Sequence, residues 1–274
     1  MIEEKQGIAF VSLPGLKQAG AVHGFLGRQG GVSEGEFRSL NLGIRTQDRP
    51  EAVAENDRRF RRAFGIPSLV RVRQVHGREV LVVDRKVKDE KAWWQVERDA
   101  VITDQPGVAL AVLTADCVPI VLFDPERRAW GIAHAGWRGA CLRTAAAAVE
   151  AMTERFGSEP RDILAGIGPG VGPCCYLVDG PVIRAVEESF GEEADELMRP
   201  ASGCRRFLDL VEANCRVLRK AGIAPEHLEK AELCTSCRAD LFFSHRRDQG
   251  RTGRQINFVM MECTVDRARC TVHS

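Results

Sequence analysis

The most regular pattern of apolar positions lies in the middle third of the chain. Residues 108–113 and 118–123 are uninterrupted apolar runs of strand length, and residues 129–134 form a third run after a polar break at 124–128. An uninterrupted run, in place of an alternation of apolar and polar residues, is typical of a strand that is covered on both faces. The pattern therefore predicts three buried strands, the last two of which form a hairpin.

The expected hairpin turns at residues 124–128, where charged and turn-forming residues replace the apolar run. We expect Phe123 to pair with the first residue after the turn, which places Val118 opposite His134. Cys117 then lies near His134 at the open end of the hairpin. Opposite Cβ atoms are about 5 Å apart and diagonal ones about 7–8 Å, a separation that two ligands of one metal can span. A shift of one residue in this register would turn one of the side chains to the other face.

Shorter segments predict further helices and strands on both sides of the hairpin. A helix is expected from about Pro50, with Asp48 as its N-cap and Gly65 at its end. The alanine-rich residues 142–156, followed by Gly157, predict a second long helix. Further strands are expected at residues 8–11, 22–25, 70–75 and 80–83, and further helices at 182–190 and 207–221.

Helices and strands alternate along the chain without a repeat, a linker or a low-complexity tract. Intermixed helices, buried strands and hairpins are typical of the α+β class. We therefore expect residues 1–274 to form a single α+β domain, in which helices pack on mixed β-sheets.

Composition and charge argue against several classes of function. The 39 basic and 38 acidic residues leave a formal net charge of +1, which gives no indication of a nucleic-acid partner or an anionic membrane surface. Asp116 and Pro119 interrupt the most apolar segment, residues 108–123, which is too short to span a bilayer. The N-terminus lacks the apolar run of a secretory signal. We therefore expect a cytoplasmic protein whose ten cysteines are reduced thiols.

His76, Cys117 and His134 are the candidates for a metal site. His76 follows the strand expected at 70–75 and precedes Gly77, so it can project from a strand end, where ligands often lie. Two imidazoles and a thiolate suit a tetrahedral zinc ion, and three protein ligands leave a fourth position for water or substrate. From the spacing alone the alternative stays open that these residues are a core cysteine and two hydrogen-bonded histidines.

A series of short motifs spans nearly the whole chain. They are residues 30–33, 39–43, 73–77, 114–119, 133–139, 166–169, 242–248 and 252–254. Together these motifs resemble those of the YfiH/YlmD family. The resemblance implies that His76, Cys117 and His134 are the ligands of one zinc ion. His245 departs from the family pattern, in which an aromatic residue is expected at that position.

The resemblance also implies an activity and a fold. Members of the family are purine nucleoside phosphorylases, which use phosphate to cleave inosine, adenosine or methylthioadenosine to the free base and ribose 1-phosphate, and which also deaminate adenosine. The implied fold is an α+β architecture with mixed sheets, similar to that of cysteine hydrolases. Members have also been labelled polyphenol oxidases or laccases, and have been linked to the editing of peptidoglycan precursors.

Two other classes of enzyme remain as alternatives. A metal-independent cysteine hydrolase acting on a peptidoglycan precursor would use Cys117 as its nucleophile and His134 as its base. A copper-dependent polyphenol oxidase needs several copper ions that are held largely by imidazoles. The chain has six histidines and no H-x-H pair, which disfavours the oxidase. One copper ion could still substitute for zinc at the three ligands.

The expected small-molecule partners, a purine nucleoside and phosphate, need groups that bind them. Asp116, beside Cys117, is a candidate catalytic residue that orients a ligand or moves a proton, with a turn or helix cap as an equal alternative. Arginines are candidates for phosphate binding, because a guanidinium matches an oxyanion with two parallel hydrogen bonds. Those within or beside the motifs are Arg28, Arg73, Arg138 and Arg246.

Cys234 and Cys237 form a C-x-x-C pair. With Cys263 and Cys270 they would make a second zinc site, but six residues separate the latter two, which does not fit a zinc knuckle. We therefore expect Cys234 and Cys237 to be reduced thiols without a metal. The glycine-rich loop at 168–173, which precedes two further cysteines, is interpreted as a turn in preference to an anion-binding loop.

Overall fold

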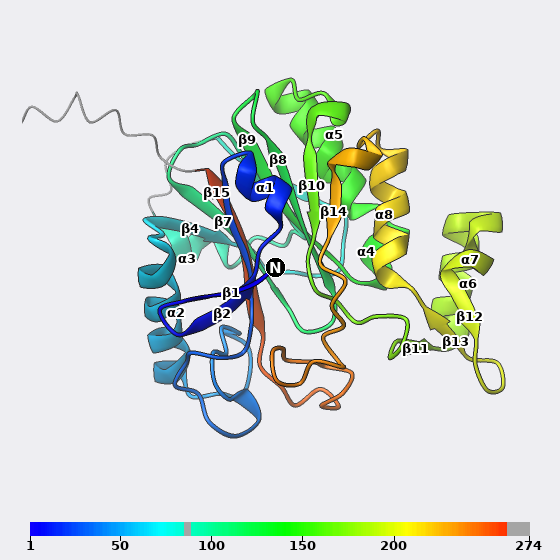
Figure 1. Cartoon of the computed structure of the whole chain (residues 1–274), viewed down its shortest axis with the longest axis horizontal. Coiled ribbons are helices and arrows are strands. Elements are labelled where there is room, and N and C mark those ends of the chain that lie inside the picture. Colours follow the sequence, from blue (N-terminus) through cyan, green and yellow to red (C-terminus); the bar gives the residue numbers. More distant parts are fainter. Residues whose placement is uncertain (85–88, 262–274) are drawn as a thin grey trace, which may run out of the picture.

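Two large β-sheets form the centre of the computed structural model, which describes residues 1–84 and 89–261 (Figure 1). Each sheet is six-stranded and mixed, with parallel pairs among antiparallel ones. The first sheet contains, in spatial order, β1 (Ile2–Lys5), β2 (Ile8–Val11), β3 (Ala21–Leu26), β15 (Gln255–Met261), β7 (Val108–Thr114) and β4 (Ser68–Arg71). The second contains β14 (Leu228–Lys230), β10 (Leu164–Ile167), β8 (Val118–Asp124), β9 (Ala129–Ala135), β6 (Ala100–Thr103) and β5 (Val80–Val83).

The two sheets pack face to face around a shared apolar core. Successive side chains of a strand point to opposite faces, so β7 directs Leu110 and Val112 toward the second sheet, and Ala109 and Ala111 toward the outer side. Both sets are buried, which explains why the strand is a continuous apolar run. The second sheet closes the core between the sheets with Val101, Val121, Phe123, Trp130 and Ile132.

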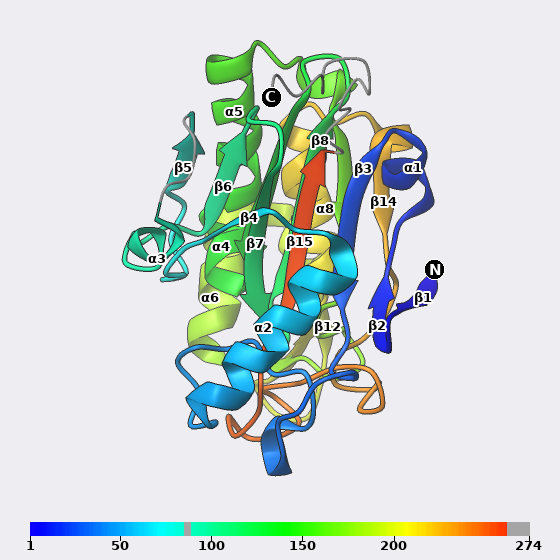
Figure 2. The ribbon, with the colours of Figure 1, turned by 90° about the vertical axis from the view of Figure 1, so that its left-hand side faces the viewer.

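Helices cover the outer face of each sheet, giving four layers (Figures 1 and 2). Phe60 and Phe64 of α2 (Pro50–Phe64) pack on Phe258 of the first sheet. α5 (Thr144–Phe156) and α8 (Leu210–Lys220) pack on the second sheet. The other helices are α1 (Pro14–Gln18), α3 (Glu90–Trp93), α4 (Trp137–Cys141), α6 (Gly180–Phe190) and α7 (Ala194–Leu197), with 3-10 turns at Gly35–Phe37, Pro160–Asp162, Gly191–Glu193 and Pro225–His227.

A small three-stranded sheet lies with α6 and α7 at one side of the four layers (Figure 1). None of the helices in the described part of the chain is both long and apolar enough to cross a bilayer. The strands of the small sheet, in spatial order, are β11 (Leu177–Val178), β13 (Arg206–Leu208) and β12 (Met198–Pro200).

The α+β class and the three buried central strands are confirmed, but the expected hairpin register is wrong by one residue. Asp124 extends the strand beyond Phe123, so Pro119 lies opposite His134. The reason is the Asp124 carboxylate, whose Oδ1 accepts hydrogen bonds from the backbone N–H groups of two loop residues that follow it. This local bonding closes a four-residue loop in place of the expected five-residue one.

The remaining differences lie at the ends of elements. Arg49 and not Asp48 is the N-cap of α2, because the Asp48 side chain instead accepts hydrogen bonds from Ser33 and Asn41. The helix expected at 142–156 begins only at Thr144, because Arg143 has a left-handed φ of 60°, and the short helix α4 precedes it.

Two further predicted segments are shorter than expected. The strand expected at 70–75 ends at Arg71, because the chain leaves the first sheet there. The helix expected at 207–221 begins only at Leu210, after β13, where the Asp209 side chain accepts a hydrogen bond from the Glu212 N–H as an N-cap.

Candidate metal centre and active-site cavity

Cys117 and His134 are carried by the hairpin of β8 and β9. Pro119 pairs with His134, and Cys117 lies two residues before Pro119, so the three side chains share one face of the hairpin. The same face continues through Val121 into the core between the two sheets. At the end of the hairpin where the core between the two sheets stops, this face therefore carries a thiol and an imidazole in place of apolar side chains.

His76 arrives at the same place from the other sheet. β4 ends at Arg71, and the chain then crosses toward the second sheet, where Arg73 forms a bridge with Glu97. His76 adopts a left-handed φ of 59°, which is uncommon for a residue other than glycine. Such a conformation persists where surrounding contacts hold the residue in place.

Asp99, which the sequence analysis did not single out, supplies those contacts. Its fully buried carboxylate accepts hydrogen bonds from the backbone N–H groups of Val75, His76 and Gly77 at 3.1, 3.0 and 2.7 Å. Nδ1 of His134 donates to the same carboxylate at 2.8 Å. A carboxylate that binds Nδ1–H leaves Nε2 free as a metal ligand. An acidic residue just before an apolar strand gives no sequence signal of this role.

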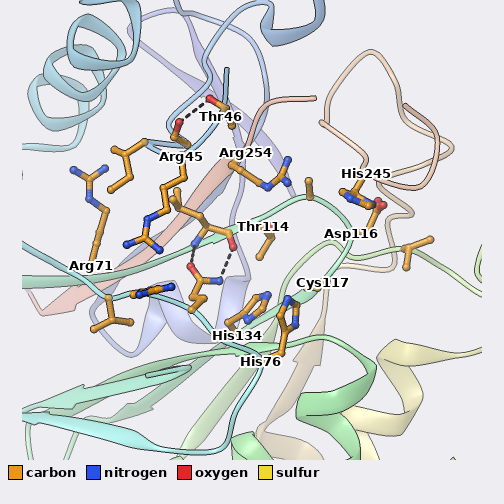
Figure 3. A pocket seen from close by; sticks show the side chains of 18 of the residues that line it. Arg45, Thr46, Arg71, His76, Thr114, Asp116, Cys117, His134, His245 and Arg254 are labelled. Atoms are coloured by element: carbon orange, nitrogen blue, oxygen red, sulfur yellow. Dashed lines mark hydrogen bonds between the residues drawn. The ribbon is translucent and has the colours of Figure 1, made fainter. Parts of the chain in front are cut away.

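The three candidate ligands converge on one point (Figure 3). One ligand atom from each lies within 4.8 Å of the other two, and the ring centroids of His76 and His134 are 4.9 Å apart. Gly136 leaves the space between them free, since a Cβ there would lie 2.9 Å from Cys117 Sγ and 3.3 Å from His76 Nδ1. Two imidazole nitrogens, a thiolate and this free space fit a zinc ion with one open coordination position.

The charges around this point favour a cation. Burial alone would lower the pKa of His134, but the Cys117 thiolate and Asp99 outweigh burial and raise it to about 9. Burial opposes ionisation of Asp99, yet its hydrogen bonds with His134 and the backbone hold its pKa below the usual value. Burial lowers the pKa of His76. A proton or a metal ion can supply the positive charge that the thiolate and the carboxylate attract.

The site opens into a cavity of about 490 Å³, which falls in the size range of small-molecule sites (Figure 3). The side chain of Gln74 fixes one wall, because it exchanges two hydrogen bonds of 2.8 Å with the backbone of Leu113. In addition to the three candidate ligands, the cavity is lined by the ring-bearing side chains of Trp94, Trp137, Tyr176 and His245. It is also lined by the arginines Arg45, Arg71, Arg73, Arg246 and Arg254.

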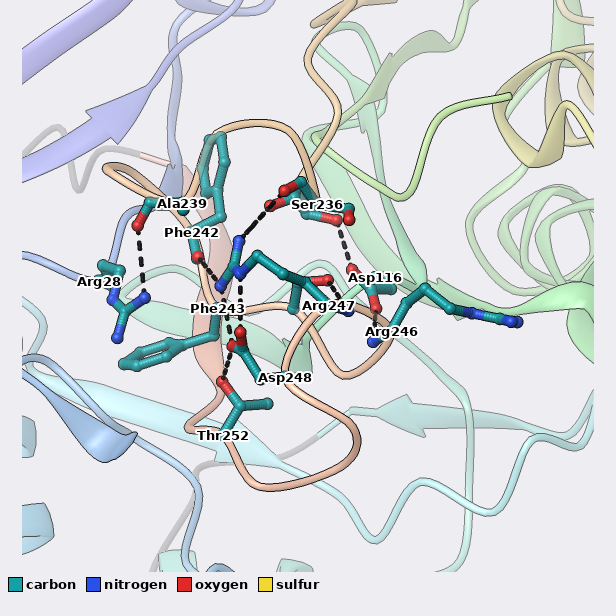
Figure 4. Close-up of polar contacts among 12 residues, drawn as sticks. Arg28, Asp116, Ser236, Ala239, Phe242, Phe243, Arg246, Arg247, Asp248 and Thr252 are labelled. Carbon is teal, nitrogen blue, oxygen red and sulfur yellow. Dashed lines mark hydrogen bonds and ion pairs between the residues drawn. The ribbon is translucent and has the colours of Figure 1, made fainter. Parts of the chain in front are cut away.

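The structure brings two of the four predicted phosphate-binding arginines to the cavity. Arg73 and Arg246 line it. Arg28 does not: its guanidinium donates to backbone carbonyl groups and lies over the ring of Phe243, 4.7 Å from its centroid (Figure 4). Arg138 is exposed and stacks on the neighbouring tryptophan of α4. The Arg28 side chain is therefore engaged away from the cavity. Arg138 lies over Trp137, which lines the cavity, so phosphate binding by Arg138 stays a prediction.

Arg45 and Arg254 line the cavity although the sequence analysis did not select them. Arg254 ends the last of the sequence motifs, and this position was the signal that could have identified it. Burial lowers the pKa of Arg254, against the attraction of Cys117 and a nearby carboxylate. Among the ion pairs of residues 1–84 and 89–261, none involves Arg45 or Arg254, whereas Arg71 and Arg73 each have a carboxylate partner. Arg254 uses Nη1 for the carbonyl oxygens of Thr252 and Gly253, which leaves Nε and Nη2 to meet an anion, as the guanidinium of Arg45 can.

Asp116 connects the cavity to a neighbouring loop. It has a left-handed φ of 95°, and its carboxylate accepts 2.6 Å hydrogen bonds from Thr235 Oγ1 and from the backbone N–H of Arg246 (Figure 4). These contacts tie residues 234–246 to the turn that carries Cys117. The observed role is thus one of positioning, and proton transfer by Asp116 stays a prediction.

The eight cysteines within residues 1–84 and 89–261 form no disulfide, and their reduced state in solution stays a prediction. Cys234 and Cys237 lie beside an unexpected pair, Cys174 and Cys175, with all four sulfurs within 4.8 Å of one another. The two cysteines outside the described residues are Cys263 and Cys270.

A family model described as "Multi-copper polyphenol oxidoreductase laccase" matches residues 22–262. Among curated proteins, the purine nucleoside phosphorylase YlmD of Geobacillus stearothermophilus is 40% identical over 247 residues, which are 88% of this chain and 90% of that protein. The purine nucleoside phosphorylase YfiH of Escherichia coli is 33% identical over 235 residues, covering 85% of this chain and 91% of that one.

Solved structures show the same architecture. The crystal structure of YlmD from Geobacillus stearothermophilus matches with a TM-score of 0.87 and 37% identity, covering 95% of this chain and 98% of that one. The crystal structure of the hypothetical protein YfiH from Bacillus licheniformis matches with a TM-score of 0.87 and 34% identity, covering 95% of this chain and 99% of that one.

Proposed function

Because the chain belongs to the YfiH/YlmD family, we propose that it is a zinc-dependent purine nucleoside phosphorylase. The reaction joins phosphate to C1′ of inosine, adenosine or methylthioadenosine and releases the purine base, and the same site deaminates adenosine. The observation that carries the proposal is the convergence of His76, Cys117 and His134 at the wall of an arginine-lined cavity. The curated relatives that are named purine nucleoside phosphorylases support the substrate class.

The metal-binding residues have distinct tasks. His76, Cys117 and His134 hold the zinc ion, and Asp99 keeps the His134 ring oriented through Nδ1. When bound, zinc supplies a Lewis acid and lowers the pKa of a coordinated water toward about 7. His76, Cys117 and His134 line the cavity, so adenine bound there would lie beside the group that activates water for deamination.

Phosphate and purine are held by other parts of the cavity. Arg254 and Arg45, which lack carboxylate partners among the described residues, and Arg246 bind phosphate. Trp94 provides a flat apolar surface for the base. Tyr176 lines the same cavity, and its phenol, which is protonated at neutral pH like that of an ordinary tyrosine, donates a hydrogen bond to the leaving purine.

One observation supports a second candidate function. His134 lies between Cys117 and Asp99, with its ring bonded to the Asp99 carboxylate, which is the order of a cysteine–histidine–aspartate hydrolase. Such an enzyme, acting on a peptidoglycan precursor, would keep its activity after zinc is removed. It would lose activity when Cys117 is alkylated.

The small number of histidines among the possible metal ligands argues against a copper-dependent polyphenol oxidase. The two groups of possible metal ligands within residues 1–84 and 89–261 contain two histidines in all. His23, for example, is buried and engaged with backbone groups. A cluster of several copper ions needs more imidazoles than this.

The test is a product analysis. Inosine with phosphate should give hypoxanthine and ribose 1-phosphate, and omission of phosphate should stop the reaction. Adenosine should yield ammonia whether or not phosphate is present, because water is then the nucleophile. Both activities should fall together in His76→Ala. Oxygen uptake with a phenol, without any phosphate-dependent release of purine, would contradict the proposal.

A further inference from the structure

Four cysteines from two distant segments meet at the surface beside the cavity. Cys174 and Cys175 follow β10, and Cys234 and Cys237 follow β14. The two segments are joined by a parallel bridge between Gly170 and Cys234. The sequence analysis rejected Cys263 and Cys270 as partners of the C-x-x-C motif and expected no metal there, but the fold brings a different pair of cysteines to it.

The four sulfurs have the spacing of a tetrahedral thiolate site. Cys237 Sγ lies 3.5 Å from Cys174 Sγ and 3.4 Å from Cys175 Sγ, and all four sulfurs lie within 4.8 Å of one another. A regular tetrahedron with zinc–sulfur bonds of about 2.3 Å has edges of about 3.8 Å. The sulfurs are therefore placed for one shared ion.

Local backbone geometry explains how neighbouring cysteines face the same point. Cys174 and Cys175 lie in a turn, where the N–H groups of Cys175 and Tyr176 both donate to Gly172 O at 3.0 Å. In a strand, adjacent side chains would point to opposite faces. On the other side, residues 234–237 form a single turn, closed by a 3.1 Å hydrogen bond from the Arg238 N–H to Cys234 O.

The surroundings stabilise negative sulfur. The backbone N–H of Gly172 donates to Cys234 Sγ at 3.2 Å. Four thiols cannot all ionise at this spacing unless a cation compensates their charge.

We propose that Cys174, Cys175, Cys234 and Cys237 bind a second zinc ion, which cross-links the two loops. Four soft thiolates select zinc, and a complete set of four protein ligands leaves no position for substrate. This site is structural and separate from the histidine-containing one.

The second zinc supports the wall of the cavity. Cys175 directly precedes Tyr176, which lines the cavity and lies under the Arg246 guanidinium. Thr235, between the two cysteines of the C-x-x-C pair, donates to Asp116, the neighbour of Cys117. Arg247 holds the same loop through the carbonyl oxygens of Thr235 and Phe242 (Figure 4). The cross-link therefore fixes groups on two sides of the catalytic site.

Metal counting tests the proposal directly. Protein without an affinity tag, purified without added metal or chelator, should contain two zinc ions per chain by elemental mass spectrometry. Cys117→Ala and Cys237→Ser should each contain one, and the double variant none. Cys204→Ser, which changes an exposed thiol outside the cluster, should keep two. Cobalt-loaded Cys117→Ala should show thiolate-to-cobalt absorption that the double variant lacks.

Alkylation of the unmutated protein gives an independent readout if a variant fails to fold. Cys174 and Cys237 are exposed, like Cys204, so without a metal they are accessible to iodoacetamide. We expect Cys204 to react at once and the four clustered cysteines only after chelation.

Several results would contradict the proposal of a second zinc site, whatever substrate the enzyme uses. One is Cys117→Ala protein that contains no zinc and has four freely reactive clustered thiols. Another is clustered cysteines that become reactive toward iodoacetamide after addition of a reductant but not after addition of a chelator, which would indicate disulfides. Iron or copper in place of zinc at full occupancy would contradict the assignment of the metal.

Discussion

The two cysteine-containing sites of this protein differ in donors, location and support. The first combines one thiolate with two imidazoles, lies where the core between the sheets opens into a cavity, and is held by the buried Asp99. The second consists of four thiols carried by two turns at the surface, and it is organised by backbone N–H groups such as that of Gly172.

With the functions proposed above, the first site carries out the reaction and the second cross-links two loops. All three ligands of the first site line the cavity, and a zinc ion with three protein ligands has a fourth coordination position for water or substrate. Four sulfurs around one point leave none. Substitutions at the first site should therefore affect the reaction, and substitutions at the second should act through the loops that it joins.

The largest expected effect is that of Cys117→Ala. Loss of the thiolate should remove zinc from the first site and lower phosphorolysis to the background rate, while the protein stays folded and keeps the zinc of the second site. Hypoxanthine release and zinc content would be measured on the same preparation. Retained phosphorolysis without the first zinc would show that the metal is not needed for chemistry.

Asp99→Asn should weaken zinc binding at the first site by about 10–100-fold, which is the usual consequence of removing a carboxylate that orients a histidine ligand. It should also destabilise the fold by about 2–3 kcal/mol, since hydrogen bonds to a charged acceptor are lost. Competition with a chelator and urea unfolding would measure the two effects. An equal loss at both metal sites would mean that the variant acts by general unfolding.

Arg254→Gln should raise the KM for phosphate about tenfold, as expected when one charge-assisted hydrogen bond is lost. Deamination of adenosine should hardly change, because it uses water. Arg161→Gln is the matched control, since Arg161 is an exposed residue paired with Glu159 on the surface. If both reactions weakened together, Arg254 would act by shaping the cavity and not by binding phosphate.

The smallest effect is expected for Gly136→Ala. The backbone there has an ordinary φ of −77°, so the added methyl group acts only through its contacts with Cys117 Sγ and His76. Overpacking of about 1 kcal/mol corresponds to roughly fivefold weaker zinc binding at the first site. Zinc titration should show no change at the second site. Unchanged affinity at the first site would place the metal away from Gly136.

The sequence predicted the parts of the fold that depend on local patterns. The apolar runs of β7, β8 and β9 identified buried strands, and Gly65 correctly ended α2. The hairpin register was wrong because it depends on one carboxylate, that of Asp124, which bonds to its own loop. A difference of one loop residue decides which side chain faces His134.

The site residues that lie in sequence motifs could be predicted, whereas those that only the fold brings together could not. His76, Cys117 and His134 were selected through the family motifs, and the fold brings them together. Asp99 was missed because a single acid before a strand has many possible roles. The two pairs of clustered cysteines are about 60 residues apart and meet through the pairing of Gly170 with Cys234 and the hydrogen bond from the Gly172 N–H to Cys234 Sγ. No spacing rule for zinc motifs covers such an arrangement.

The most direct test of the central claim is the dependence of phosphorolysis on zinc at the first site. Metal-stripped protein would be reconstituted with increasing zinc, and phosphate-dependent hypoxanthine release from inosine would be measured against occupancy, with Cys117→Ala as the zero reference. We expect no activity without zinc and activity proportional to occupancy of the first site. Full activity in zinc-free protein, or activity in reconstituted Cys117→Ala, would contradict the account.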